Sequence, residues 1–218
     1  MTSIRMSPVH AQLEALQPQW EERLGMQVAA KLPGDAAAML EAVAIADLSH
    51  LRKCGLKGPG AERWLRDHDI PVPDGVNAWA MLPAGGVIAR LGRSEFFVED
   101  GEAGVVVESI GASLGFGAAG VYPVIRQDAG FALAGRRVNE LLVQTCNVNF
   151  EAFGAEEKIA VMTQMVGVSV LAIRAIHARV PCYRLWCDPT FAPYFRETLT
   201  GIAEELGGAA IGVDALPI

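Results

Sequence analysis

The sequence lacks any apolar run of the roughly 20 residues that a membrane-spanning helix needs. Its longest candidate, residues 166–173, has only the length of a strand. It also lacks an excess of positive charge, since 18 lysines and arginines face 25 aspartates and glutamates and the basic residues are scattered. Nucleic acids and anionic membranes are bound by clustered basic residues. We therefore expect neither a nucleic-acid partner nor membrane association.

Cysteine is scarce as well, with four in the whole chain. The first nine residues contain Arg5 but no apolar block after it, so we expect no export signal, a cytoplasmic location and reduced thiols. Cys182 and Cys187 are close in sequence, but no histidine lies near them at ligand spacing. We therefore expect them to be small buried apolar side chains, and we assign no metal ligand.

What the chain does contain is enough apolar material for a sizeable core: 51% of its 218 residues are hydrophobic and 20% are charged. The spacing of apolar residues predicts a set of helices and strands. The helices are expected at residues 9–24, 36–43, 61–66, 103–114, 138–142 and 193–206. The strands are expected at residues 45–56, 87–91, 95–99, 160–173 and 181–187, with a hairpin around residues 92–94. Residues 125–133 are expected to form a strand pair or one bent strand.

A unit of strand, glycine turn and helix occurs twice. The first copy, at residues 47–61, turns at Gly58-Pro59-Gly60. The second, degenerate copy has Gly135 in the place of Gly58, and its helical stripe follows from Val138. Each half then reads strand-helix-strand-strand-helix, which predicts an α+β fold with helices packed on antiparallel sheets.

We place the N-terminal half at residues 1–114 and the C-terminal half at residues 115–218. The glycine-rich residues 111–120 are expected to form the linker between the halves. A phosphate-binding glycine loop is the alternative, but such a loop directly follows a strand and opens a helix. Here the glycines follow an expected helix and precede an extended segment, which favours the linker.

Two ordered sets of motifs resemble a known family. Residues 47–51 (Asp-Leu-Ser-His-Leu), followed by Leu56, Gly58-Pro59, Ala61 and Leu65, resemble the opening motif of the aminomethyltransferase (glycine-cleavage T-protein) superfamily. Residues 90–98 resemble the next hairpin of that superfamily. The second half is more similar to one branch, the gamma subunit of heterotetrameric sarcosine oxidase, at residues 142–150, 162–170 and 183–194. Together the matched stretches span about residues 40–206.

The resemblance implies a two-part fold around a central cleft and a lineage that handles one-carbon units on tetrahydrofolate. In sarcosine oxidase the gamma subunit accompanies larger chains that carry the flavins, the NAD and the folate site, and it has no assigned catalytic role. The transferases place a carboxylate just after a glycine-led strand. The corresponding run here, residues 167–174, contains no Asp or Glu. Methylene transfer needs a carboxylate to stabilise a developing cation or to move a proton, so this absence argues against transferase activity.

We therefore expect a non-catalytic, gamma-like subunit of a heteromeric, flavin-dependent sarcosine or methylamine-type oxidase or dehydrogenase. Its partner would be a larger flavoprotein amine oxidase subunit. The alternative, which the residues leave open, is a compact tetrahydrofolate-dependent aminomethyltransferase or a folate-binding protein acting alone. The aromatic cluster of Phe191, Tyr194 and Phe195 is either part of the core or a docking patch for the partner.

Five residues are candidates for contacts with a folate cofactor. Arg126 and Arg174 follow strong strand signals and suit an anionic tail such as the folate glutamate, with structural ion pairs as the alternative. Tyr183 and Trp186 suit stacking on a pterin ring, with core packing as the alternative. Gln164, from the matched stretch 162–170, completes the set. No catalytic residue is assigned.

Acid–base chemistry at Asp47, Ser49 and His50 is the other option that the sequence raises. We expect Asp47 and Ser49 to bond the local backbone as a turn instead, and His50 to lie at a rim. His177 is expected in a polar hairpin turn, where it would be a poor buried base.

Overall fold

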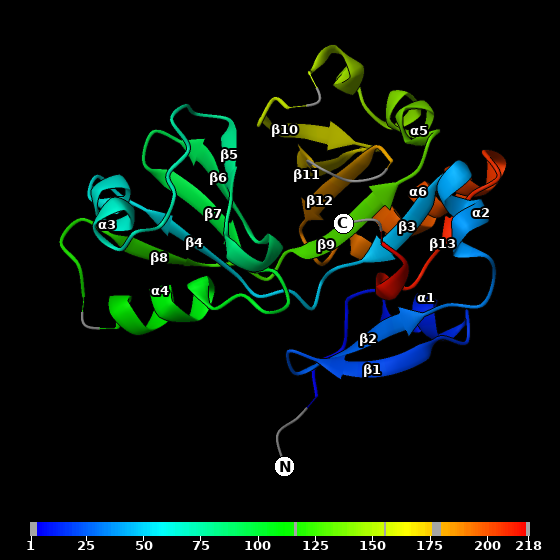
Figure 1. The fold of residues 1–218 in the computed structure, drawn as a ribbon, viewed down its shortest axis with the longest axis horizontal. Helices are drawn as coiled ribbons and strands as arrows, with labels where there is room; N and C mark the ends of the chain where they lie inside the picture. Colours follow the sequence, from blue (N-terminus) through cyan, green and yellow to red (C-terminus); the bar gives the residue numbers. More distant parts are fainter. Residues whose placement is uncertain (1–3, 116, 155, 176–179, 217–218) are drawn as a thin grey trace. The chain divides into compact units, whose positions relative to one another are not determined.

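The computed structural model describes residues 4–115, 117–154, 156–175 and 180–216. Contacts group the chain into two compact units. Unit 1 comprises Met1–His50, Asp128–Glu157 and Val161–Ile218, and unit 2 comprises Leu51–Gln127 and Lys158–Ala160. Figure 1 labels the helices and strands of both units.

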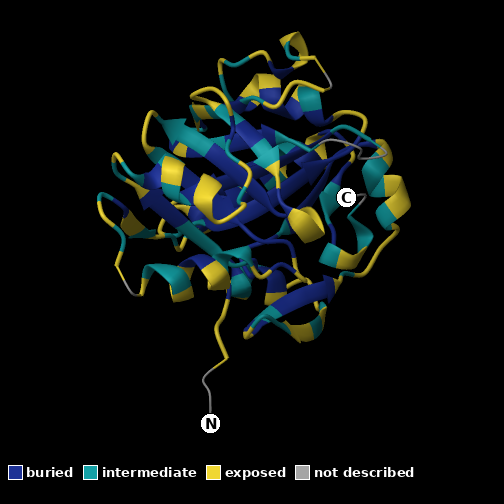
Figure 2. Cartoon of the chain, turned by 60° about the vertical axis from the view of Figure 1, so that its left-hand side comes forward, coloured by how far each residue is buried: buried dark blue, intermediate teal, exposed yellow. Residues whose placement is uncertain are grey.

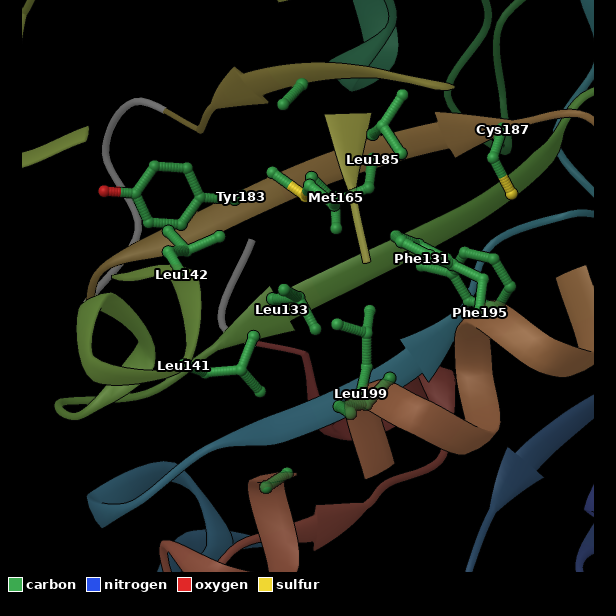
Figure 3. Close-up of a cluster of buried hydrophobic side chains, with 14 of the residues drawn as sticks. Phe131, Leu133, Leu141, Leu142, Met165, Tyr183, Leu185, Cys187, Phe195 and Leu199 are labelled. Carbon is green, nitrogen blue, oxygen red and sulfur yellow. The ribbon is translucent and has the colours of Figure 1, made fainter. Parts of the chain in front are cut away.

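Unit 1 is built on a six-stranded sheet, which runs antiparallel from β11 to β3 and then adds β13 parallel to β3. Its strands, in sheet order, are β10 (Ala160–Met165), β11 (Val168–Arg174), β12 (Cys182–Cys187), β9 (Ala129–Ala134), β3 (Ala44–Asp47) and β13 (Ala209–Ala210). Helices α5 (Val138–Thr145) and α6 (Ala192–Glu205) supply buried residues to the main core of this unit. Figure 3 shows that core, with Phe131 and Leu133 of β9 facing Phe195 and Leu199 of α6.

Smaller elements complete unit 1. A two-stranded hairpin and two short helices come from the first 41 residues, and two 3-10 turns lie later in the chain. These elements are α1 (His10–Glu14), β1 (Gln19–Arg23), β2 (Met26–Lys31), α2 (Ala36–Glu41), η2 (Phe150–Ala152) and η3 (Val213–Ala215).

Unit 2 is built on a five-stranded antiparallel sheet. Its strands, in sheet order, are β5 (Ala78–Met81), β6 (Val87–Gly92), β7 (Glu95–Glu99), β4 (Lys53–Lys57) and β8 (Tyr122–Ile125). Helices α3 (Ala61–Asp67) and α4 (Val106–Leu114) pack on one face around buried Leu56, Leu65 and Ile110, and η1 (Pro83–Gly85) precedes β6. In Figure 2 the strands of both sheets are mostly coloured as buried.

The internal repeat predicted from the sequence is present. The chain order β4-α3-β5-β6-β7-α4 recurs as β9-α5-β10-β11-β12-α6, and β3 and β8 precede the two copies. Each copy therefore has more strands than the predicted pattern. Gly58 and Gly135 occupy equivalent places between first strand and first helix, and both have a positive φ, of 119° and 138°. The α+β class with helices on largely antiparallel sheets is confirmed.

The two compact units differ from the N- and C-terminal halves because the halves exchange a strand. β3 comes just before β4 in the chain but pairs with β9, the first strand of the second repeat. β8 comes just before β9 but pairs with β4, the first strand of the first repeat. Residues 111–120, predicted as a linker between the halves, consequently lie inside unit 2. Local patterns do not reveal such pairing between distant segments.

Two stretches predicted as single elements are instead divided. The helix predicted at residues 9–24 forms only at α1, which ends at Glu14, and residues 19–23 form β1, which joins β2 through a hairpin turn at Leu24 and Gly25 with φ of 51° and 72°. Positive φ at both central residues is typical of the tight turns that join antiparallel strands. The strand predicted at residues 160–173 is divided into β10 and β11 by a similar turn at Val166 and Gly167. The sequence did not predict this turn, because β-branched residues such as Val166 rarely adopt a positive φ.

None of the helices in the part of the chain that the structure describes is long and apolar enough to cross a membrane.

Candidate functional site

The face of the unit 2 sheet opposite α3 and α4, here called the far face, carries the first group of candidate side chains. Because side chains alternate along a strand, Cys54 and Leu56 point to the helix-covered core while Lys53, Gly55 and Lys57 point to the far face. The strand register places one row of residues side by side across this face: Trp79, Ala89, Phe97, Gly55 and Val124.

Arg126, a predicted folate contact, lies over this row. Its guanidinium carbon is 5.9 Å from the centroid of the Phe97 ring, and its Nη2 is 3.2 Å from Oε1 of Glu95. Gly55 makes room for it, because a Cβ at that position would be 3.2 Å from Nε of Arg126. A planar cation held over a ring suits a carboxylate ligand. Glu95 already takes that role at Nη2 of Arg126.

A buried ion pair lies on the same face. Nζ of Lys53 is 3.1 Å from Oε2 of Glu99, and the two side chains are 2% and 0% exposed. Lys53 also donates a hydrogen bond to the carbonyl of Leu51. Neither residue is among the candidates predicted from the sequence. The signal was available, because Glu99 ends an apolar strand at a position whose alternation directs it to the same face as Phe97.

The neighbouring Asp100 has a structural role. Its carboxylate accepts backbone hydrogen bonds from Val106 at 3.1 Å and Val107 at 3.0 Å, and so caps the N-terminus of α4. Burial raises the pKa of the Asp100 carboxyl, and the two backbone hydrogen bonds oppose that shift. Burial, followed by the charge of Asp100, raises the pKa of the Cys54 thiol to about 12. Such a thiol is a poor nucleophile.

In unit 1 the structure brings two of the predicted contacts together. Arg174 and Tyr183 are direct partners in the β11–β12 register. Tyr183 lies in the main core (Figure 3) and donates its hydroxyl to Oδ1 of Asn139 at 2.8 Å, while its ring meets Phe150 edge-on at 5.3 Å between centroids. Arg174 donates to the carbonyl of Phe153 at 3.5 Å. The Tyr183 ring is thus already packed, which is the core placement weighed as the alternative to stacking on a ligand.

The other two unit 1 candidates lie on the opposite face of the same sheet. Trp186 is buried there, and the guanidinium carbon of Arg184 is 5.6 Å from its ring centroid. Gln164 is exposed on β10, next to the core residue Met165. The five candidates therefore do not form one cluster. Arg174 and Tyr183 are adjacent, Trp186 and Gln164 share the other face, and Arg126 belongs to unit 2.

Asp47 and Ser49, two of the residues considered for acid–base chemistry, form a local turn at the end of β3. Oδ1 of Asp47 accepts hydrogen bonds from the backbone N–H and the hydroxyl of Ser49, and the Ser49 hydroxyl accepts from the N–H of Gly130. This confirms the predicted local turn. The rim position predicted for His50 is wrong, because His50 is buried. His177 lies outside the described residues.

The cysteines of β12 point to opposite faces of their strand. Cys187 belongs to the main core, whereas Cys182, five residues earlier, points away from it. Burial raises the pKa of each thiol to about 12. They therefore serve as small apolar side chains. Across the described ranges, no group of three or more histidine, cysteine, aspartate or glutamate side chains is placed to hold a metal ion.

The repeat adds a second glycine-led strand to the one noted in the sequence. β6 is the counterpart of β11 and follows Gly85 and Gly86. Like β11, β6 contains no aspartate or glutamate. The position at which the transferase resemblance implies a carboxylate thus lacks one in both repeats.

The aromatic cluster at the start of α6 is divided between core and surface. Phe195 is fully buried, with its ring centroid 5.8 Å from that of Phe131. Phe191 and Tyr194 are each about half exposed, and the Tyr194 hydroxyl donates to the carbonyl of Val166.

Comparison with known proteins gives matches among solved structures only. No model of a known protein family matches the sequence, and no curated protein matches it. The glycine cleavage system aminomethyltransferase T from Bartonella henselae superposes with a TM-score of 0.75 at 15% identity, over 98% of this chain and 61% of that one. A chain of the heterotetrameric sarcosine oxidase from Corynebacterium sp. U-96 superposes with a TM-score of 0.69 at 19% identity, over 94% of this chain and 97% of that one.

The chain has the aminomethyltransferase fold. The predicted likeness to aminomethyltransferases and to heterotetrameric sarcosine oxidase is thereby confirmed at the level of structure. The chain spans about three fifths of the length of the aminomethyltransferase T chain and nearly all of the sarcosine oxidase chain.

Proposed function

We propose that the chain is a non-catalytic subunit of a cytoplasmic, heteromeric, flavin-dependent sarcosine or methylamine-type oxidase or dehydrogenase linked to tetrahydrofolate one-carbon metabolism. The observation that carries the proposal is the structural match to a chain of a heterotetrameric sarcosine oxidase, which covers 94% of this chain and 97% of that one. This match to a component of a heterotetramer supports a gamma-like role.

The chemistry of the two sheets supports a non-catalytic role. Neither glycine-led strand, β6 or β11, carries a carboxylate. On the far face of unit 2, Glu95 is paired with Arg126 and Glu99 with Lys53.

The test is assembly with a flavoprotein amine oxidase chain from the same source. Co-expression is expected to give a single species in size-exclusion chromatography, in which flavin absorbance and this chain elute together. The control is each chain expressed alone. Elution of this chain as a separate monomer beside an intact, flavin-loaded partner would sink the proposal.

A second candidate, a folate-binding protein acting alone, is favoured by Arg126 over Phe97, where a cation and a ring lie together on one face. It predicts heat and a thermal shift when tetrahydrofolate is titrated into the isolated chain. Arg126→Met should then abolish both signals, while Arg136→Met, which removes an exposed arginine paired with Glu41, should leave them unchanged. Titration without heat or thermal shift would rule this candidate out.

A further inference from the structure

Strand β8 forms one edge of the unit 2 sheet, with β4 as its only paired neighbour among the described strands (Figure 1). Its four residues carry no charge, and two of them are strongly exposed, Ile125 at 86% and Tyr122 at 57%. Natural sheet edges are protected by shortness, by charge, by proline or by a covering element, because an uncovered apolar edge pairs readily with another chain. β8 is short and contains Pro123, but it carries no charge and has no strand on its outer side among the described strands.

The backbone groups that face outward can be assigned from the hydrogen bonds of β4. The N–H of Gly58 donates to Ser94, on the β7 side, so the even-numbered residues of β4 bond towards β7. Gly55 and Lys57 must then bond towards β8, where their register partners are Val124 and Tyr122. The intervening residues of β8, Pro123 and Ile125, point their backbone groups away from β4. Proline is tolerated at such an edge because no hydrogen-bond donor is needed towards its own sheet.

In unit 1, β3 takes the place that β8 has in unit 2. β3 pairs with β9 in the register in which β8 pairs with β4, so Ala44 corresponds to Tyr122 and Asp47 to Ile125. The outer edge of β3 is covered by β13, which lies parallel to it.

Backbone hydrogen bonds hold β13 on that edge. The N–H of Ala209 donates to the carbonyl of Val43 at 3.0 Å, and the N–H of Ile211 donates to that of Ile45 at 2.9 Å. By the shared register, the corresponding acceptors on β8 are the carbonyls of Val121 and Pro123. Carbonyl acceptors are thus present at both positions of the β8 edge. Pro123 stands where β3 has Ile45, and it has no N–H to donate.

We propose that the outer edge of β8 binds a short extended segment of a partner chain, parallel to β8, as β13 binds the edge of β3. The segment would donate to the carbonyls of Val121 and Pro123, pair with the outward backbone groups of Ile125, and cover the Ile125 side chain. Because β8 is uncharged and exposes apolar side chains, the complementary segment is apolar. Addition of a strand to an open edge is an established mode of peptide recognition. This deepens the proposed function, on which it rests, by locating a contact with the larger subunit.

The first test uses a synthetic peptide with the sequence of residues 207–213, the segment that contains β13. In the full chain at saturating peptide, exchange of the Ile125 amide is expected to slow by about tenfold or more, since a bonded amide exchanges only on local opening. Ile125→Lys should abolish this protection. Val143→Lys, which changes an equally apolar residue 67% exposed on α5, should leave it intact. Unchanged exchange at Ile125 with the peptide present would overturn the proposal.

The second test uses the co-expressed complex and separates this inference from the proposed function. Ile125→Lys is expected to release the flavoprotein chain while Val143→Lys retains it. A complex that survives Ile125→Lys, with the Ile125 amide still exchanging rapidly, overturns the edge contact but leaves the subunit role. Binding of the peptide without any complex supports the edge and counts against the subunit role. Concentration-dependent dimers abolished by Ile125→Lys would show a second copy on the edge and overturn the partner segment.

Discussion

Replacement of Gly135 by alanine is expected to destabilise unit 1 by at least about 3 kcal/mol, which is among the largest effects of a single substitution. Gly135 has a φ of 138°, a conformation that costs a residue with a Cβ about 1–3 kcal/mol. The new Cβ would also lie 2.2 Å from the carbonyl oxygen of Ala42, which accepts the N–H of Arg137. The clash therefore breaks the turn from β9 into α5. The midpoint of urea unfolding measures the loss.

A glycine-to-alanine substitution elsewhere in unit 1 should stabilise the protein instead. Gly201 lies inside α6, and a Cβ added to it would have no atom within 4 Å, so Gly201→Ala should stabilise the protein by about 0.5–1 kcal/mol through helix propensity. Gly58→Ala should reproduce the loss in unit 2, because its Cβ would meet the carbonyl of Gly120 at 2.3 Å. A Gly135→Ala protein as stable as the wild type would mean that the shared turn does not hold the repeat together.

Replacement of Lys53 by methionine is expected to cost about 3–5 kcal/mol. Methionine keeps most of the lysine stem, so the main loss is the charge partner of Glu99. The Glu99 carboxylate is 0% exposed and would remain buried without the ammonium group that lies 3.1 Å from it. Urea unfolding followed by tryptophan fluorescence would report the loss in unit 2, where Trp64 and Trp79 lie.

The double variant Lys53→Met/Glu99→Leu serves as the control. With both charges removed and similar volumes kept, its stability is expected to lie within about 1 kcal/mol of the wild type, because a buried ion pair is often no better than an apolar pair of the same size. The cycle of single and double variants then isolates the coupling energy. Equal losses in the single and double variants would show that Lys53 acts through packing rather than through its charge.

Residue types alone predict the candidate folate contacts only in part. Arg126 is recognisable because it follows a strand, but its ring partner Phe97 and the space left by Gly55 depend on strands that are distant in sequence. Tyr183 is recognisable as an aromatic residue in a strand, yet strand alternation alone does not tell which face is covered. Strand alternation directs Glu99 to the same face as Phe97, but its burial and its pairing with Lys53 depend on strands that are distant in sequence.

The sequence by itself determined the modules of this protein. The glycine turns at Gly58 and Gly135, the hairpin of β6 and β7 and the helix α6 follow from conformational preferences and apolar spacing over a few neighbouring residues. Only the tertiary structure decided how the modules combine. The exchange of β3 and β8 between the repeats, the cover of one strand edge by β13 and the exposure of the other depend on hydrogen bonds between segments far apart in the chain. Their free energies compete across the whole fold, and no local pattern records which pairing is the most stable.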